Sequence, residues 1–168
     1  MSANQTTIYR AIYNDEIEKY NNPELLKNSE YLKMNYCKDL YSDKNNLDYD
    51  KIAKSLGLES CEGFLHFFAS EEFATKYASA LNSMEPSREA SVYEFSFDNE
   101  LLKSCEGKGL YHGNNPFKMK FTTEEQVEYA IPIEKYNPQE NFVGKLENNV
   151  EINQTLQSIP YDPDAYLY

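Results

Sequence analysis

Basic residues, histidines and cysteines are all scarce in this chain of 168 residues. Lys and Arg total 16 against 28 Asp and Glu, which gives a formal net charge of −12. Because general nucleic-acid-binding proteins use cationic surfaces to displace counterions, this balance argues against that class. His66 and His112 are the only histidines, so a metal site built from several histidines is excluded. The three cysteines are too few and too scattered for a disulfide scaffold or a zinc site, and we expect free thiols in a reducing cytosol.

Long apolar runs and the common nucleotide and metal motifs are also missing. No apolar run approaches the roughly 20 residues that a membrane-spanning helix needs, and the first residues, MSANQTTIYR, lack the basic and apolar regions of a signal peptide. We therefore expect a cytoplasmic protein without membrane contact, although delivery to another cell stays open because some export routes use no cleaved signal. There is no GxxxxGK(S/T) phosphate loop, no GxGxxG, no HExxH and no CxxC pair.

Aromatic residues compensate for a lean supply of aliphatic ones. The chain has 15 Tyr and 9 Phe but no Trp, and its length fits one domain of roughly 150 residues. We therefore predict a core rich in Tyr and Phe, in which each buried Tyr hydroxyl needs a hydrogen-bond partner.

Short runs of β-branched and aromatic residues predict the strands. They lie at 8–13, 64–68, 92–97 and 128–133, with shorter candidates at 117–121 and, as a hairpin, at 142–146 and 150–152. In the 92–97 run, aromatic residues alternate with polar ones, which predicts a strand that is buried on one face. Residues 104–116 contain three Gly and a Pro and are predicted to form a loop.

Helical periodicity fills most of the space between the first two strands. A short helix is predicted over 16–20, and 23–57 is helical with a polar break at 43–46. A longer helix begins after Ser70, an N-cap residue, and ends near Pro86. This order predicts a single α+β domain over 1–168 with a mixed or antiparallel sheet, a helical insert at about 14–57 and a C-terminal hairpin or tail at about 137–168.

Three separated pieces of the chain carry candidate chemistry. Arg10 lies inside the first predicted strand, on the same face as two isoleucines, which is an unusual place for a guanidinium unless it faces a cleft. The second piece is Ala69-Ser70, which closes the strand at 64–68. The third is Gln126-Val127-Glu128-Tyr129-Ala130-Ile131-Pro132, in which a Gln, one residue and a Glu open an apolar strand that ends at a Pro.

This order and spacing resembles the ADP-ribosyltransferase family of the Arg-Ser-Glu class, over about residues 8–136. In that family an Arg lies on an early strand, a Ser on a central strand, and a Gln or Glu two residues before the catalytic Glu on a later strand. The resemblance implies the family's sheet, NAD as a substrate and transfer of ADP-ribose to a protein side chain. The family's usual Ser-Thr-Ser is reduced here to Ala69-Ser70.

The resemblance also implies a role for each matching residue. Glu128 would stabilise the oxocarbenium-like cation that forms when the nicotinamide–ribose bond of NAD⁺ breaks, as in glycoside hydrolysis. Arg10 would bind the pyrophosphate, because its planar fork matches phosphate oxygens. Ser70, with Phe68 before it, would line the NAD site and hold the strand and Glu128. Gln126 implies an acceptor other than arginine, and Phe121, in a loop over about 114–126, implies an aromatic contact with the target protein.

Each of these residues also has a purely structural explanation. Arg10 can be an edge-strand arginine paired with one of the many acids, Ser70 a helix cap, and Gln126 and Glu128 solvated residues at the start of a strand. His66, in an apolar strand, is typical of a satisfied core histidine. His112 lies in a Gly-rich loop and is a candidate contact. Cys37, Cys61 and Cys105 are predicted to be ordinary thiols rather than nucleophiles.

Four functions are therefore left open by the sequence. The first is an NAD-dependent mono-ADP-ribosyltransferase, of the kind found among toxins and effectors, that binds no metal. The same site with water as the acceptor would make an NAD glycohydrolase. The third is an inactive binding protein on the same fold. The fourth is an acidic, phage-type inhibitor that mimics nucleic acid, suggested by the charge of −12. An acidic surface steers basic protein partners, which favours a protein target.

Overall fold

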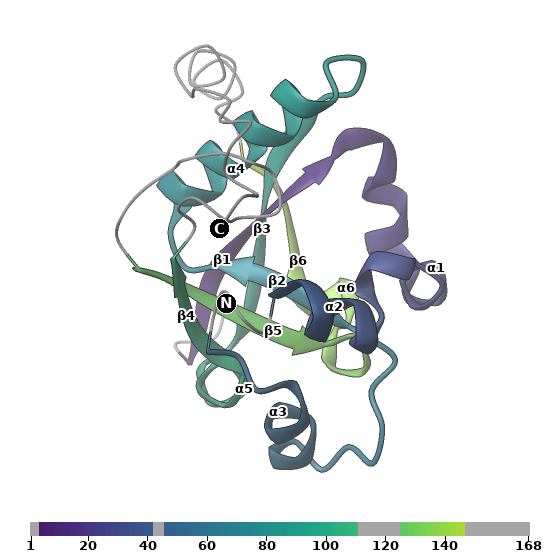
Figure 1. Cartoon of the computed structure of the whole chain (residues 1–168), viewed down its shortest axis with the longest axis vertical. Helices are drawn as coiled ribbons and strands as arrows, with labels where there is room; N and C mark the ends of the chain where they lie inside the picture. The colour runs from purple at the N-terminus through teal and green to yellow at the C-terminus, as the bar shows by residue number, and fades with distance from the viewer. Residues whose placement is uncertain (1–3, 42–45, 111–124, 147–168) are drawn as a thin grey trace.

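The computed structural model describes residues 4–41, 46–110 and 125–146. They form one antiparallel sheet of six strands in the order β4-β5-β2-β1-β3-β6 (Figure 1), so the predicted α+β class with an antiparallel sheet is confirmed. The strands are β1 (Gln5–Tyr13), β2 (Phe64–Phe68), β3 (Ala90–Asp98), β4 (Glu106–Leu110), β5 (Glu125–Pro132) and β6 (Phe142–Lys145).

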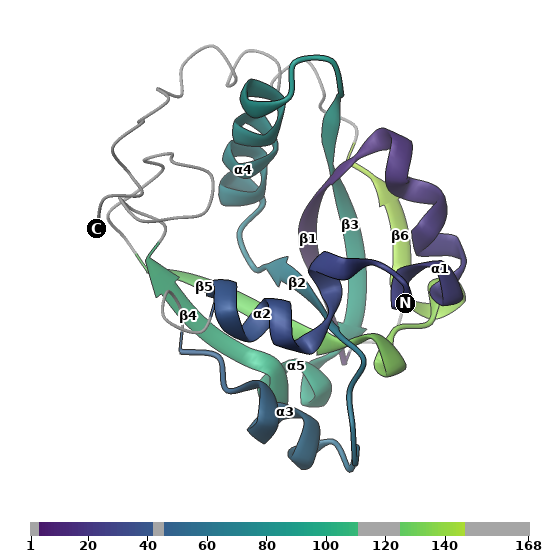
Figure 2. The same ribbon diagram turned by 45° about the vertical axis from the view of Figure 1, so that its right-hand side comes forward.

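The sheet is divided into two halves between β1 and β2. β1 pairs with β3 along its whole length, from Gln5 opposite Asp98 to Tyr13 opposite Ala90. β2 pairs with β5 along its whole length as well. Between β1 and β2, however, the register contains a single pair, Tyr9 opposite Phe68. We call this place the junction. Figure 2 shows β1, β3 and β6 running in one direction and β5 and β4 crossing at another, with the junction where the two halves meet.

The predicted helical region between β1 and β2 is confirmed. It contains η1 (Asn14–Asn21), α1 (Pro23–Lys27), η2 (Glu30–Leu32), α2 (Met34–Tyr41) and α3 (Tyr49–Ser55). Pro23 occupies the first turn of α1, where its missing N–H costs nothing. The Asp48 side chain caps α3 by accepting from the Lys51 amide, and Gly57, with φ of 75°, follows the end of this helix. Most of the predicted break at 43–46 lies outside the described residues.

Helix α4 (Glu71–Met84) is the long helix that the sequence predicts, and it covers one side of the sheet. Ser70 caps it as predicted, because its hydroxyl accepts a hydrogen bond from the Phe73 amide at 3.0 Å. Its apolar face, with Phe73 and Tyr77, packs against Phe68 of β2 and Val92 of β3. The helix thereby spans the junction and contacts both halves of the sheet.

The core is rich in Tyr and Phe, as predicted, and its hydroxyls have partners. Tyr20 and Tyr136 are 1 % and 5 % exposed. The Tyr136 hydroxyl donates to the Tyr20 carbonyl at 2.5 Å, and the Tyr20 ring lies 5.9 Å from that of Phe95. Tyr49 packs against Phe64 of β2, with ring centroids 4.8 Å apart. Burial of tyrosine here brings hydrogen bonds as well as apolar area.

Several sequence predictions are wrong. β3 is buried on both faces along most of its length, because Phe95 and Phe97 pack into the main core on one face and Ala90 and Val92 pack against α4 on the other. Residues 104–110 are no loop: α5 (Asn99–Cys105) leads directly into β4. The glycine that suggested a loop, Gly107, instead lets β4 lie against Leu47, whose Cδ2 would be 2.6 Å from a Cβ at this position.

The C-terminal part of the described chain is more regular than predicted. η3 (Ile133–Lys135) follows β5, and within the region expected to be a hairpin or tail α6 (Pro138–Asn141) precedes β6, which pairs with β3. The second strand of the expected hairpin, at 150–152, and the candidate strand at 117–121 lie outside the described residues.

Candidate functional site

Arg10 lies at the junction, and its side chain reaches from β1 to β2. It follows Tyr9, the residue of β1 that pairs with β2. Its Nη1 donates to the His66 carbonyl of β2 at 2.8 Å, and its Nε donates to the Tyr20 hydroxyl of η1 at 2.8 Å. The strand face that it shares with Ile8 and Ile12 explains its half-buried position, and the separation of β1 and β2 makes room for the guanidinium. It is not an edge-strand arginine, because β1 lies between β2 and β3.

Glu128 lies on β5, one strand beyond β2, and is 1 % exposed. Its backbone is in register with Phe68 on one side and Gly107 on the other. Gln126 is two residues earlier and therefore on the same face of the strand, where it is half-buried. The alternative of a solvated carboxylate at the start of a strand is wrong for Glu128, because almost none of the residue is exposed to solvent.

The charges of Arg10 and Glu128 both act on one buried thiol. Cys37 of α2 is fully buried, and burial is the main reason why its pKa is raised to about 12. A backbone hydrogen bond from Phe64 and the positive charge of Arg10 oppose this shift, whereas the negative charge of Glu128 adds to it. Arg10 and Glu128 are thus close enough to the same atom to influence it, on opposite sides of β2. The thiol itself is protonated at neutral pH and is a poor nucleophile.

Phe68 ends β2, the strand between those of Arg10 and Glu128, and Ser70 follows it as the N-cap of α4. Phe68 is 5 % exposed and packs against Phe73 and Tyr77, with ring centroids 4.7 and 5.1 Å away. The Ser70 hydroxyl accepts from the Phe73 amide, which is the capping contact predicted from the sequence. Its role in holding Glu128 stays a prediction.

His66 is a buried histidine with a partner, as its apolar strand indicates. It is 7 % exposed, and its Nε2 lies 2.8 Å from the Tyr49 hydroxyl. Burial, and secondly the positive charge of Arg10, lower its pKa from 6.5 to about 3. The imidazole is therefore neutral at physiological pH, and its main contribution to Arg10 is its backbone carbonyl.

Tyr20 and Tyr49 belong to this site but were not identified from the sequence. Tyr20 holds the guanidinium directly, and Tyr49 holds the histidine whose carbonyl does the same. Both lie in the helical region between β1 and β2. No local signal distinguishes them, because the chain contains 15 Tyr and their partners are set by tertiary contacts.

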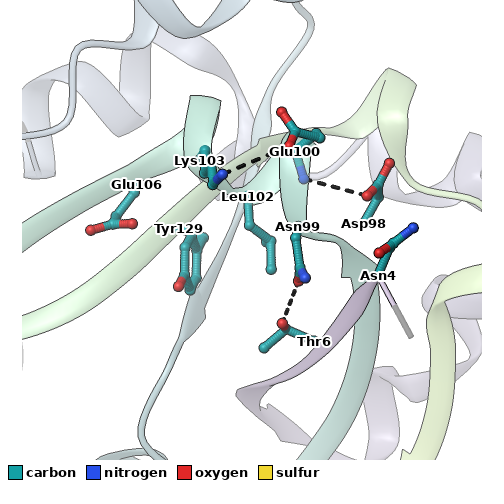
Figure 3. A pocket seen from close by; sticks show the side chains of 9 residues that line it. All are labelled: Asn4, Thr6, Asp98, Asn99, Glu100, Leu102, Lys103, Glu106 and Tyr129. Carbon is teal, nitrogen blue, oxygen red and sulfur yellow. Dashed lines mark hydrogen bonds and ion pairs between the residues drawn. The ribbon is translucent and has the colours of Figure 1, made fainter. Parts of the chain in front are cut away.

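A cavity of about 540 Å³ lies away from the junction, between α5 and the ends of several strands (Figure 3). Its lining includes Thr6, Asp98, Glu106 and Tyr129. Arg10, Ser70 and Glu128 do not line it, and Tyr129 points to the opposite face of β5 from Glu128. The cavity is therefore separate from the candidate site.

Two candidate contacts, Phe121 and His112, lie outside the described residues. All three cysteines are free and buried. Within residues 4–41, 46–110 and 125–146 there is no cluster of His, Cys, Asp and Glu suited to a metal ion. In the same part of the chain, no helix has both the length and the apolar character to span a membrane.

Comparison of the chain with protein-family models, with curated proteins and with solved structures finds no match. Function must therefore be inferred from the residues at the junction.

Proposed function

We propose that this protein is an NAD-dependent mono-ADP-ribosyltransferase that modifies a protein side chain, on a sheet of the ADP-ribosyltransferase type. The observation that carries the proposal is the junction. Arg10 and Glu128, more than a hundred residues apart in sequence, lie on β1 and β5, and the Ser piece directly follows β2, the strand between them. Both charged residues lie beside Tyr9 and Phe68, the pair that joins the two halves of the sheet: Arg10 follows Tyr9, and Glu128 is opposite Phe68.

The buried carboxylate supplies the chemistry of bond breaking. Cleavage of the bond between nicotinamide and ribose sends the bonding electrons to nicotinamide and leaves a cation spread over C1′ and the ring oxygen. Glu128, 1 % exposed on an inner strand, would stabilise that cation strongly because little water screens its charge. An acceptor side chain then forms the new bond at C1′ and gives up a proton.

The guanidinium of Arg10 supplies the binding of NAD⁺. Arginine binds phosphate oxygens in pairs through its planar fork, and here the guanidinium is held by the hydrogen bonds that it donates to acceptors on two different elements. The pyrophosphate of NAD⁺ carries such oxygens. This assignment accounts for an arginine on a strand face otherwise occupied by isoleucines.

Gln126 and the overall charge indicate the acceptor. Gln126 lies on the face of β5 that carries Glu128, so it would meet the acceptor beside the reacting carbon. A neutral amide at that place favours an acceptor other than arginine. The formal charge of −12 favours a target protein with a basic surface.

The test is nicotinamide release from NAD⁺ by wild type and by Glu128→Gln. We expect the substitution to lower the rate by about 100-fold or more, because it removes the charge that stabilises the transition state. Glu94→Gln is the matched control, since Glu94 is a half-buried glutamate on β3 opposite Tyr9. Melting temperatures show that both variants are folded. Full activity in a folded Glu128→Gln protein would contradict the catalytic assignment.

Mass spectrometry of a cell lysate incubated with enzyme and NAD⁺ separates transfer from hydrolysis. A lysate protein that gains the mass of one ADP-ribose, only with wild type, identifies a transferase. Nicotinamide release without a labelled protein identifies an NAD glycohydrolase.

One observation favours a second function, binding of NAD⁺ without turnover. The Ser70 hydroxyl caps α4, and the nearby Phe68 packs against α4, so Ser70 and Phe68 both have structural contacts. An inactive protein of this kind would still be stabilised by NAD⁺, because a ligand that binds only the folded state raises the melting temperature. A melting temperature that rises with NAD⁺, without any nicotinamide release, would support binding without turnover.

A further inference from the structure

We infer that Tyr20 is a positioning residue that fixes the Arg10 guanidinium in the orientation needed to bind the NAD⁺ pyrophosphate. The inference rests on the proposed function and extends it to the helical region between β1 and β2. That region is not only a cover for the sheet: through Tyr20 of η1 it contacts the residue assigned to NAD⁺ binding.

The two hydrogen bonds from Arg10 to described residues define the plane of its guanidinium. Nε donates to the Tyr20 hydroxyl and Nη1 to the His66 carbonyl, each at 2.8 Å. The acceptors come from η1 and from β2, so they approach the guanidinium from different elements. The guanidinium carbon also lies 5.9 Å from the centroid of the Tyr20 ring, within the range of a cation–π interaction. A rotation of the side chain would break both hydrogen bonds.

Tyr20 is itself held in place. It is 1 % exposed, and its ring lies 5.9 Å from that of Phe95 and 6.5 Å from that of Tyr136. The Tyr136 hydroxyl donates to the Tyr20 backbone carbonyl at 2.5 Å. The Tyr20 hydroxyl therefore occupies a fixed point beside β1, which is what a positioning contact requires.

An arginine that is oriented in advance binds phosphate more tightly, because less conformational freedom is lost on binding. The orientation of Arg10 affects the binding of NAD⁺ and not the breaking of the nicotinamide–ribose bond, which the proposal assigns to Glu128. Loss of the Tyr20 hydroxyl should therefore raise KM for NAD⁺ and leave kcat nearly unchanged.

The experiment measures nicotinamide release against NAD⁺ concentration for wild type, Tyr20→Phe and Tyr93→Phe. Tyr20→Phe should raise KM about tenfold, the size expected for a hydrogen bond to a charged group, with kcat within about twofold of wild type. Tyr93→Phe is the matched control. Tyr93 is 5 % exposed, and its hydroxyl donates to Asn14 at the start of η1 at 2.7 Å, so the variant also removes a buried tyrosine hydrogen bond to that element. Its KM should stay at the wild-type value.

Arg10→Lys supplies a second, independent test. A lysine cannot make the same two hydrogen bonds, so Tyr20→Phe should raise KM less than twofold further in the Arg10→Lys background. Equal effects of Tyr20→Phe in both backgrounds would overturn the inference, as would an unchanged KM in Tyr20→Phe or an equal rise in Tyr93→Phe. These results leave the proposed function standing. A wild-type protein that neither releases nicotinamide nor is stabilised by NAD⁺ would overturn the proposed function and this inference together.

Discussion

The imidazole of His66 is kept uncharged by its position in β2. It is surrounded by buried aromatic residues and lies near the positive charge of Arg10, and both effects lower its pKa, burial more than the charge. In the unfolded chain the same histidine has an ordinary pKa near 6.5. The unfolded state therefore binds a proton that the folded state does not bind at any pH between 6.5 and about 3.

This difference predicts a loss of stability in mild acid. Above pH 6.5 the histidine is neutral in both states and has no effect, whereas below pH 6.5 protonation favours the unfolded chain. We expect wild type to lose about 2 kcal/mol more of its free energy of unfolding than His66→Gln between about pH 7.5 and about pH 5. Urea unfolding of both proteins at the two pH values measures this difference in the free energy of unfolding. Parallel losses in the two proteins would show that His66 can be protonated without unfolding.

Ser70 shows how one residue at the end of an element fits two explanations. Its hydroxyl caps α4, and its place after β2 matches the Ser piece of the proposed active site. The capping contact is sufficient to explain a serine there, because Ser, Thr, Asp and Asn all accept a hydrogen bond from the first turn of a helix. The two roles can be separated, since the second one depends on the chemistry of the hydroxyl.

We expect Ser70→Ala to lower the free energy of unfolding by about 1 kcal/mol and Ser70→Asp to restore most of it, because aspartate also caps helices. Nicotinamide release then distinguishes the roles. Wild-type kcat and KM in Ser70→Asp would show that Ser70 acts only as a cap. A stable Ser70→Asp protein with a reduced rate would support the predicted role at the site. Chemical denaturation and the release assay provide the two measurements.

Elements with a strong local pattern could be predicted, and elements defined by distant contacts could not. The alternation in β1, the apolar run of β2 and the capped, amphipathic α4 are all visible in short stretches of sequence. β4 could not be predicted because its glycines suggest a loop, whereas Gly107 lies in a strand where Leu47 leaves little room for a Cβ. The hydrogen bond between Arg10 and the His66 carbonyl joins residues 56 positions apart, and no local pattern encodes it. Candidate residues such as Glu128 could be named, but the partners that hold them could not.

At the scale of the whole molecule, Gly63 ties the helical region to the sheet. It lies just before β2 and forms an isolated bridge with Lys33, while its carbonyl accepts from the Ile133 amide at 3.1 Å. A Cβ at this position would lie 1.8 Å from the Leu32 carbonyl oxygen. Because that atom belongs to the backbone, it can move away only if the whole segment shifts.

Gly63→Ala should therefore destabilise the protein by about 3 kcal/mol or more, at the upper end of what overpacking costs. Gly57→Ala is the control. Nothing lies within 4 Å of a Cβ at Gly57, whose φ is 75°, so only backbone strain is added there, at a cost of about 1 kcal/mol. Urea midpoints compare the two variants. Equal losses of stability in Gly63→Ala and Gly57→Ala would mean that the backbone around Gly63 shifts to accept a Cβ at little cost in free energy.

The hydrogen bond from Arg10 to His66 has a consequence for how the protein can change. If the pairing of β1 with β2 continued in the same register, Ala11 would lie opposite His66. The main chain at that position would then supply the hydrogen bonds between the strands, whatever the side chain. Instead, the His66 carbonyl accepts a hydrogen bond from the guanidinium of Arg10. Main-chain ladders survive almost any point mutation, because every amino acid except proline brings the same N–H. This cross-link between β1 and β2 instead depends on the side chain of one residue. A single amino-acid substitution at Arg10 can therefore remove it and change how firmly the two halves of the sheet are joined.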